Sequence, residues 1–390
     1  MEQTINRLAH VALPFLKLGT IAFGGPAAHI AMMEDEFVRR RRWLEREQFL
    51  DLLGITNLIP GPSSTEMAIY IAYLRAGLAG LIVGGSCFIL PAALIVGVLA
   101  WVYVSFGKLS LTTGVLYGVK PVVIAIILQA LWRLGRTAVK TQFLALIGLL
   151  AVGLTFLGGN ALIVLFGTGA ISGIKQWLVQ RGSAGGPLSS LLITTPLLTL
   201  TKVATTPTLT APKTVTLLPL FLVFLKVGAV VFGSGYVLLA FLQDDLVTQR
   251  HWLSDAQLLD AIAIGQVTPG PVFTTATFIG YILAGIPGAI IATVGIFLPG
   301  FLFVALCRPV VAFLRQSPIA GAFLDGINVA ALALMIVVTK QLAVAALINW
   351  LTVLLALASL VLLIRFCLNS VWLVLFGAII GLGTSALGMT

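Results

Sequence analysis

The sequence has few charged residues. Only 9% of its 390 residues are Asp, Glu, Lys or Arg, whereas 59% are hydrophobic. A soluble domain carries about 25% charged residues because water must solvate its surface. This chain has too little charge to cover a water-facing surface, so we expect a hydrocarbon core to surround most of it.

Histidine and cysteine are also scarce, with three of each. The cysteines, Cys87, Cys307 and Cys367, lie far apart in apolar segments, which predicts neither a disulfide framework nor a metal site. The sequence contains no His-Glu-x-x-His motif, no Walker loop and no Gly-x-Ser-x-Gly motif. We therefore expect no enzymatic activity, no metal and no cofactor, and transport that depends on gradients.

Acidic residues are fewer than basic ones, which gives a net charge of +10. A basic chain can bind nucleic acid, but the cytoplasmic loops of membrane proteins also collect Lys and Arg. The low overall charge favours the second interpretation. We expect membrane lipid as the surroundings and no nucleic-acid partner, and a homodimer is left open.

Long uncharged runs indicate how the chain meets the membrane. Residues 78–107, 141–174, 341–364 and 366–390 contain no Asp, Glu, Lys or Arg. A helix needs roughly 20 apolar residues to cross a bilayer. The runs lack the strict polar–apolar alternation of an outer-membrane barrel. They predict an all-α integral membrane protein.

The chain repeats itself at an offset of 209 residues. Leu16-Lys17-Leu18-Gly19 matches Leu225-Lys226-Val227-Gly228, and Pro60-Gly61-Pro62 matches Pro269-Gly270-Pro271. Further identities fall at the same spacing, and near Pro91 and Pro299 the offset becomes 208. We predict two homologous halves, half one (1–179) and half two (214–390), joined by a Ser/Thr/Pro/Gly-rich linker (180–213).

Each half is expected to follow one helical plan. A first helix is interrupted by a glycine motif, and a Pro-Gly-Pro break then divides a pair of apolar helices. Four further helices complete the half, giving about 10 transmembrane helices plus broken, re-entrant pairs. The expected ranges are 8–33, 47–59, 62–75, 78–104, 110–132, 141–157 and 160–178, then 215–243, 254–268, 271–284, 286–306, 318–338, 341–364 and 370–388.

The relative orientation of the halves depends on the first helix. If it crosses the membrane, each half has five crossings and the halves are inverted; if it is re-entrant, each has four and they are parallel. Both arrangements place 14 basic residues inside and 4 outside, so loop charge does not decide. Arg39 to Arg42 crowd one loop, whereas the matching loop of half two holds only Arg250 and His251. That difference favours an inverted repeat.

Two pairs of interrupted segments predict a binding site. They are Phe23-Gly24-Gly25-Pro26 with Phe232-Gly233-Ser234-Gly235, and the repeated Pro-Gly-Pro. Broken helices at matching positions of two halves are the best sequence pointer to the binding site of a transporter. Such backbone survives at membrane depth only when it is buried in protein or lines a wet cavity.

Each Pro-Gly-Pro suits the start of a helix that faces an anion. Pro62 and Pro271 fit the first helical turn, where no amide donor is needed. The next amides would be unpaired at the positive end of the helix dipole, with Thr65 and Thr274 adding hydroxyl donors. These amides belong to Ser63, Ser64 and Thr65, and to Val272, Phe273 and Thr274. The alternative is a simple kink in which each threonine bonds back to its own helix.

Lys17 and Lys226 are matched lysines within apolar helices. A charge at that depth costs at least about 2.5–3.5 kcal/mol and marks a functional residue. Either lysine could neutralise a bound anion. The alternative is a snorkelling lysine, or one paired with Asp35 or Asp244.

Other polar residues within apolar segments have no matched partner of the same type. Interhelical hydrogen bonds are the favoured interpretation for them, with proton carriage by His29 or Glu66 as the weaker alternative. They are His29, Glu66, Arg75, Lys120, Gln266 and Asn328.

Together these motifs resemble the chromate ion transporter family. Gly19 to His29, Trp43-Leu44 and Ile59-Pro60-Gly61-Pro62 are similar to its N-terminal signature. Trp252-Leu253 and Gln266 to Pro271 are similar to its C-terminal signature. The resemblance covers essentially the whole chain and matches the long, two-half form of the family. It implies an inner-membrane protein with oppositely oriented halves that exports chromate, a tetrahedral dianion.

The motifs and the resemblance give one set of predicted substrate-binding residues. A transporter that takes up or exchanges sulfate or a related oxyanion, and an uncoupled anion channel, remain alternatives. A lipid-acting enzyme is disfavoured because no nucleophile–base pair is evident. The set is Lys17, Lys226, Gly24, Gly25, Pro26, His29, Pro60, Gly61, Pro62, Ser63, Ser64, Thr65, Gly233, Ser234, Gly235, Gln266, Pro269, Gly270, Pro271 and Thr274.

Overall fold

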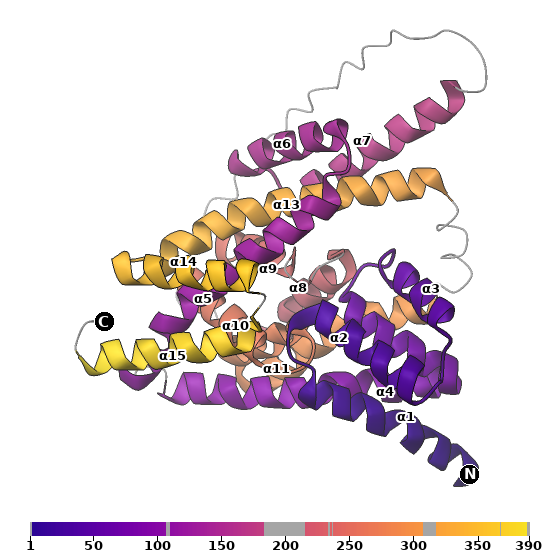
Figure 1. Ribbon diagram of the computed structural model, residues 1–390, viewed down its shortest axis with the longest axis horizontal. Coiled ribbons are helices and arrows are strands. Elements are labelled where there is room, and N and C mark those ends of the chain that lie inside the picture. The colour runs from indigo at the N-terminus through magenta and orange to yellow at the C-terminus, as the bar shows by residue number, and fades with distance from the viewer. Residues whose placement is uncertain are drawn as a thin grey trace.

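The computed structural model describes residues 2–106, 110–182, 215–232, 235, 237–306, 317–366 and 368–387. Within these ranges the chain forms helices and no strands. Five helices are long and apolar enough to cross a membrane, and five shorter apolar helices accompany them. In Figure 1, α6, α7 and α13 form one side of the molecule and α1 and α4 the opposite side, with α8, α10 and α11 between them. The chain is a multi-pass, all-α membrane protein.

The helix boundaries follow the predicted plan closely. Half one contains α1 (Glu2–Ile21), α2 (Gly25–Met33), η1 (Glu34–Arg40), α3 (Arg46–Thr56), α4 (Ser63–Phe106), α5 (Ser110–Ala138), α6 (Gln142–Phe156) and α7 (Ala161–Gly182). Half two contains α8 (Leu217–Val230), α9 (Val237–Leu242), η2 (Gln243–Gln249), α10 (Asp255–Val267), η3 (Val272–Thr274), α11 (Thr275–Leu306), α13 (Pro318–Ala346), α14 (Trp350–Arg365) and α15 (Ser370–Ala386). The matching segments η1 and η2 are both π-helical.

One predicted boundary is wrong. The uncharged run predicts a helix over 341–364, but α13 continues to Ala346 and α14 begins at Trp350. The reason is a capping box, in which the Asn349 side chain accepts a hydrogen bond from the Thr352 amide. The cap sits at the repeat position of Thr141, which caps α6 in the same way.

The first helix of each half folds back on itself at its glycine motif. In half one, Lys17 on α1 pairs with Glu36 on η1 at 3.8 Å, and the rings of Phe15 and Phe37 lie 4.8 Å apart. In half two, Lys226 pairs in the same way with Asp245. The segments 8–33 and 215–243 are therefore helical hairpins and not single continuous helices.

α4 and α11 each contain a second reversal. The backbone leaves the helical region at Ala76–Gly77 and at Ala284–Gly285, with almost identical angles. Gly85 lies against the Ile69 side chain, although 16 residues would span about 24 Å of straight helix. Each helix is thus a short segment (63–75; 275–283) followed by a long one that runs back (78–106; 286–306).

The Pro-Gly-Pro breaks lie at the tips of a second set of hairpins. The Arg75 guanidinium, at the end of segment 63–75, lies 5.3 Å from the Trp43 ring centroid, just before α3 begins. α3 and segment 63–75 therefore start and finish at the same end of the molecule. α3 and segment 63–75 therefore form a helical hairpin, and its re-entrant position in the membrane stays a prediction.

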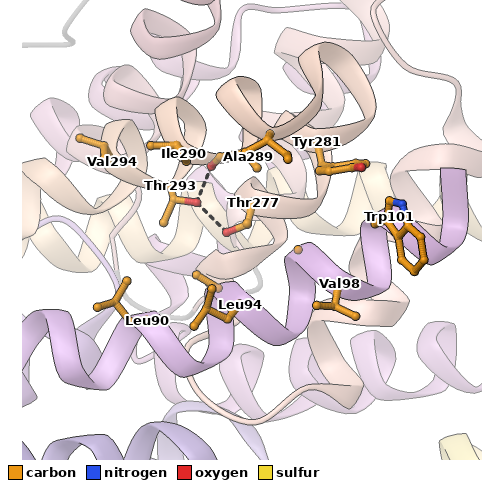
Figure 2. Close-up of a pocket in the computed structure, with 13 residues that line it drawn as sticks. Leu90, Leu94, Val98, Trp101, Thr277, Tyr281, Ala289, Ile290, Thr293 and Val294 are labelled. Carbon is orange, nitrogen blue, oxygen red and sulfur yellow. Dashed lines mark hydrogen bonds between the residues drawn. The ribbon is translucent and has the colours of Figure 1, made fainter. Parts of the chain in front are cut away.

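Equivalent helices of the two halves run in opposite directions. Along α4, Gly85 contacts Phe301 and Leu90 lies opposite Val294 of α11 (Figure 2). α5 and α13 behave likewise, because Gly135 contacts Leu332 and Lys140 contacts Asp325.

Helices of each half also pack against helices of the other half. α5 packs on α15 where Gly118 meets the backbone of Gly377, and α13 packs on α7 where Gly326 meets the backbone of Thr168. A Cβ at Gly118 or Gly326 would overlap the opposing carbonyl oxygen. The apolar core accordingly contains side chains from both halves.

Candidate functional site

The hairpin tips of the two halves meet in the centre of the molecule. The Gly61 amide donates to the Val231 carbonyl at 2.6 Å, and the Gly270 amide donates to the Ala22 carbonyl at 2.8 Å. The two bonds are related by the repeat offset. Residues 61–72 and 268–280 are all buried. Each Pro-Gly-Pro therefore rests on the glycine motif of the opposite half, and we call this junction the tip cluster.

Both central glycines of the tip cluster are required by geometry. Gly61 has φ 131° and Gly270 has φ 85°, in the left-handed region that favours glycine. A Cβ on Gly61 would overlap Glu66 Oε1, and one on Gly270 would lie 2.7 Å from the Ala92 methyl group. Pro-Gly-Pro thus supplies both a tight turn and a close approach between the halves.

The helix starts differ in part from the expected anion site. The Thr65 amide donates to the Pro62 carbonyl at 2.7 Å, and the Thr274 amide donates to the Pro271 carbonyl at 3.0 Å. One tight turn closes on each proline, so these two amides are not free as expected. The amides that remain as candidates for an anion are those of the first two residues of each start.

The side chains at the two starts are unequal. In half two, the Thr274 and Thr275 hydroxyls donate to the carbonyls of Pro271 and Val272, each at 2.8 Å. The back-bonded alternative therefore holds for Thr274. In half one, the Thr65 hydroxyl and both carboxyl oxygens of Glu66 are buried without a hydrogen-bond partner among the described residues. At the two helix starts, the buried polar atoms without a hydrogen-bond partner among the described residues therefore belong to half one.

His29 connects three parts of the tip cluster. Its Nε2 lies 3.0 Å from the Ala22 carbonyl and its Nδ1 lies 3.3 Å from the Ser64 hydroxyl. A carbonyl only accepts, so Nε2 carries the hydrogen and Nδ1 accepts from Ser64. The same carbonyl receives the Gly270 amide. His29 thereby links α2 to the start of α4 and to the tip of the opposite half.

Lys17 and Lys226 are held by carboxylates of their own halves. Lys17 lies 3.8 Å from Glu36, and Lys226 lies 2.7 Å from Asp245. The structure pairs the lysines with these residues rather than with the neighbouring Asp35 and Asp244 considered from sequence. The lysine side chains are 52% and 36% exposed, whereas Glu36 and Asp245 are buried.

Glu36 is suited to pair with Lys17 as an ionised carboxylate. Burial raises the pKa of Glu36, but the hydrogen bond from Arg41 and the positive charges of Lys17, Arg41 and Arg40 lower it more, so its pKa lies below the ordinary value. A cavity of about 280 Å³ adjoins this pair, lined also by Asp35 and Arg40. The role of the two lysines in anion binding stays a prediction.

A buried ion pair joins the halves, and sequence reasoning did not identify it. Lys120 of α5 lies 2.9 Å from Asp260 of α10, and the Tyr103 hydroxyl of α4 donates to the same carboxylate at 2.9 Å. Lys120 was recognised only as a buried polar residue. The repeat offered a signal, since Asp260 matches Asp51 whereas Lys120 matches Asn328, so the pair can form on one side only.

The remaining predicted site residues are distributed around the tips. Gly24 and Gly25 have positive φ and, with Pro26, begin α2. Gly235 lies against Val272 and Phe273. Pro60 and Pro269 precede Gly61 and Gly270. Gln266 Nε2 is buried without a hydrogen-bond partner in the described part of the chain. Asn328 lines a separate cavity of about 290 Å³. Gly233 and Ser234, like Cys307, Cys367 and residues 183–214, lie outside the described residues.

An apolar groove between α4 and α11 does not suit an oxyanion. It measures about 520 Å³, and Leu90, Leu94, Val98 and Ile290 line it (Figure 2). Its threonines, Thr277 and Thr293, already bond to each other. An apolar lining has no donors to replace the hydrogen bonds that an anion makes with water, so binding there would be unfavourable. No group of three or more candidate metal ligands occurs in the described ranges.

Comparison with known proteins gives a consistent result. The family described as "Chromate transporter" matches residues 9–174 and 218–382. A "Chromate transport protein" of Cupriavidus metallidurans is 35% identical over 96% of this chain and 92% of its own length. A "Probable chromate transport protein" of Synechococcus elongatus is 34% identical, covering 81% and 80%, and a "Chromate transport protein" of Pseudomonas aeruginosa is 30% identical, covering 84% and 79%. No solved structure matches the chain.

Proposed function

Because this chain belongs to the chromate transporter family, whose members are membrane transport proteins and not enzymes, we propose that it exports chromate across the cytoplasmic membrane as a secondary transporter. The tip cluster carries this proposal. Two sets of hairpins, one from each half, meet there through the Gly61–Val231 and Gly270–Ala22 hydrogen bonds. Irregular backbone at such a depth is typical of the substrate site of a transporter.

The electrostatics of the tip cluster favour a tetrahedral anion. Helix starts present amides and a partial positive charge, and Ser63 and Ser64 form the first turn of α4. An inside-negative potential drives a dianion outward with about 4.6 kcal/mol per 100 mV, at about 2.3 kcal/mol for each charge. Membrane potential alone is therefore a sufficient driving force for export.

We further propose that the halves form an inverted repeat. Because the first helices are hairpins and the four later helices of half one bring the chain back to its starting end, this arrangement requires the chain to pass between the two ends once more between α7 and α8. The opposite directions of α4 and α11, and of α5 and α13, support it, since parallel halves would align equivalent helices in the same direction. From the Trp43 end of the molecule, segment 78–106 runs away, α5 returns, α6 leaves and α7 returns. The corresponding helices of half two run in the opposite sense.

Basic residues agree with this arrangement once the hairpins are known. Twelve described Lys and Arg residues lie at the Trp43 end, and two lie at the Trp252 end. The twelve are Arg39, Arg40, Arg41, Arg42, Arg46, Arg75, Arg133, Arg136, Lys140, Lys175, Arg181 and Arg365, and the two are Arg250 and Lys340. Cytoplasmic ends collect Lys and Arg, so the Trp43 end faces the cytoplasm in this proposal.

Labelling of single cysteines tests the topology. In a chain without its three native cysteines, Cys at position 42 should react with an impermeant maleimide only after the cells are opened. Cys at position 251, its repeat counterpart, should react in intact cells. Labelling of both positions from the same side would contradict the inverted repeat.

Chromate accumulation tests the function. Cells that express the protein should accumulate less chromate than control cells, and the Lys17→Ala and Lys226→Ala variants should lose this effect because each removes a cation near a tip. Proteoliposomes with imposed potentials or pH gradients, supplied with labelled chromate and sulfate, would distinguish chromate export from sulfate transport. Saturable flux would exclude a channel. Unchanged accumulation with the wild-type protein would contradict chromate export.

A further inference from the structure

One carboxyl group in the tip cluster lacks everything that normally stabilises a buried charge. Glu66 has no exposed surface, and neither of its carboxyl oxygens has a hydrogen-bond partner among the described residues. An ionised carboxylate in such surroundings is strongly disfavoured unless it is paired. Asp260 and Glu36 show how this chain satisfies other buried acids, each with a lysine and a further donor.

Glu66 lies where the two halves touch. Its Oε1 lies against Gly61, where a Cβ would overlap it, and a Cβ built on Gly300 of α11 would lie 3.8 Å from the same oxygen. It sits on the first turns of α4, beside the unsatisfied Thr65 hydroxyl. The corresponding residue of half two is Thr275, which is neutral and back-bonded. Only one of the two helix starts therefore carries an ionisable group.

The elements packed around Glu66 bring no cation to it. Residues 272–306, which include η3 and α11, contain no charged residue. α2 contributes His29, which is engaged with Ser64 and Ala22. α1 contributes Lys17, held by Glu36, and His10, which is exposed near its start. On α3, Arg46 pairs with Glu34, and Glu47 and Asp51 are acidic. On α10, Asp255 bonds to Gln243 and Asp260 pairs with Lys120.

We propose that Glu66 is a proton-binding residue of the transport cycle, and that its proton and the oxyanion occupy the tip cluster together and move in the same direction. The inference rests on the proposed function and deepens it. A dianion and an ionised Glu66 at one helix start would repel each other at low dielectric, so protonation of Glu66 must accompany anion binding. By linkage, the anion must equally favour protonation.

This coupling has a consequence for energetics. One proton carried with a chromate dianion leaves one net negative charge in the transported complex. The membrane potential then still drives export, but with half of the electrical work available to the bare dianion. A proton gradient directed inward opposes export instead of driving it.

Proteoliposomes containing the full-length protein test this inference at alkaline pH, where chromate is fully the dianion. Two rates are measured: exchange of labelled for unlabelled chromate, and proton movement driven by a chromate gradient with a pH-sensitive dye inside. The wild type should show both, with protons following chromate. Glu66→Gln, which imitates the protonated side chain, should lower the ratio of chromate-driven proton flux to chromate exchange at least tenfold while exchange remains measurable. Glu66→Asp, which can still bind a proton, should retain the wild-type ratio.

Glu47→Gln on α3 is the matched control, because it removes an exposed carboxylate and should leave both rates unchanged. Normal chromate-driven proton flux in Glu66→Gln would overturn the inference while chromate transport stands. Proton movement opposite to chromate in the wild type would overturn it without any variant. A wild-type protein that does not exchange chromate would instead contradict the proposed function, and the inference with it.

Discussion

Replacement of Gly61 with alanine is expected to reduce chromate transport at least tenfold. The residue has φ 131°, and a Cβ there would overlap the Glu66 carboxyl group. A side chain with positive φ costs roughly 1–2 kcal/mol, and displacement of Glu66 adds to it. The Gly61 amide also holds the tip of the opposite half through Val231. Because about 1.4 kcal/mol corresponds to a factor of ten, a shift of this junction is enough for the expected loss. Labelled chromate flux per mole of purified protein measures it.

Gly97→Ala is the matched control for this change. Gly97 lies in α4, the helix that follows Gly61, has ordinary helical geometry, and has open space where a Cβ would be built. Alanine favours a helix over glycine by about 1 kcal/mol, so this variant should be at least as stable as the wild type and should transport normally. Equal transport by Gly61→Ala and Gly97→Ala would show that the tip cluster tolerates a shift at its centre, and would contradict its role as the substrate site.

The repeat made much of the fold predictable. Lys17 and Lys226, and the two Pro-Gly-Pro motifs, occupy equivalent positions in the structure, as their constant offset indicated. The motifs also predicted where helices begin and end, because glycine and proline change backbone geometry locally. Such signals are contained in a few neighbouring residues, so they can be recognised without knowledge of the tertiary structure.

Features that depend on packing were less predictable. The lysines pair with Glu36 and Asp245 and not with Asp35 and Asp244, and all four acids lie in segments, η1 and η2, whose π-helical form the sequence did not predict. Loop charges could not orient the halves, because a crossing first helix and a re-entrant one gave the same numbers of basic residues inside and outside. The fold-back at Ala22–Gly24 is a further packing feature, because it depends on contacts between α1 and η1 such as Lys17 with Glu36.

The Lys120–Asp260 pair should be the most sensitive electrostatic contact between the halves. The side chains are 19% and 5% exposed, and Asp260 also accepts the Tyr103 hydroxyl. Asp260→Ala leaves a lysine charge buried without its partner, a change that typically costs about 3–5 kcal/mol. We expect a large decrease in the midpoint of thermal unfolding, measured on protein purified in detergent. The loss should accompany separation of α10 from α5, because these helices carry the pair.

Two further variants identify the cause of that loss. Lys120→Met combined with Asp260→Leu removes both charges and should recover most of the stability, because an apolar pair of similar volume avoids the cost of burying ions. Asp325→Ala breaks the Lys140–Asp325 pair, which is shorter at 2.7 Å but 58% and 31% exposed, and should cost at most about 1 kcal/mol. A double variant as unstable as Asp260→Ala would mean that the Asp260 carboxylate stabilises the fold through Tyr103 rather than through the lysine.

The position of the pair makes this distinction important for function. The pair joins α10, whose C-terminal end leads to Gly270, to the long helices of the opposite half. If the pair is what fixes α10, then transport should fall in Asp260→Ala and return in the double variant together with stability.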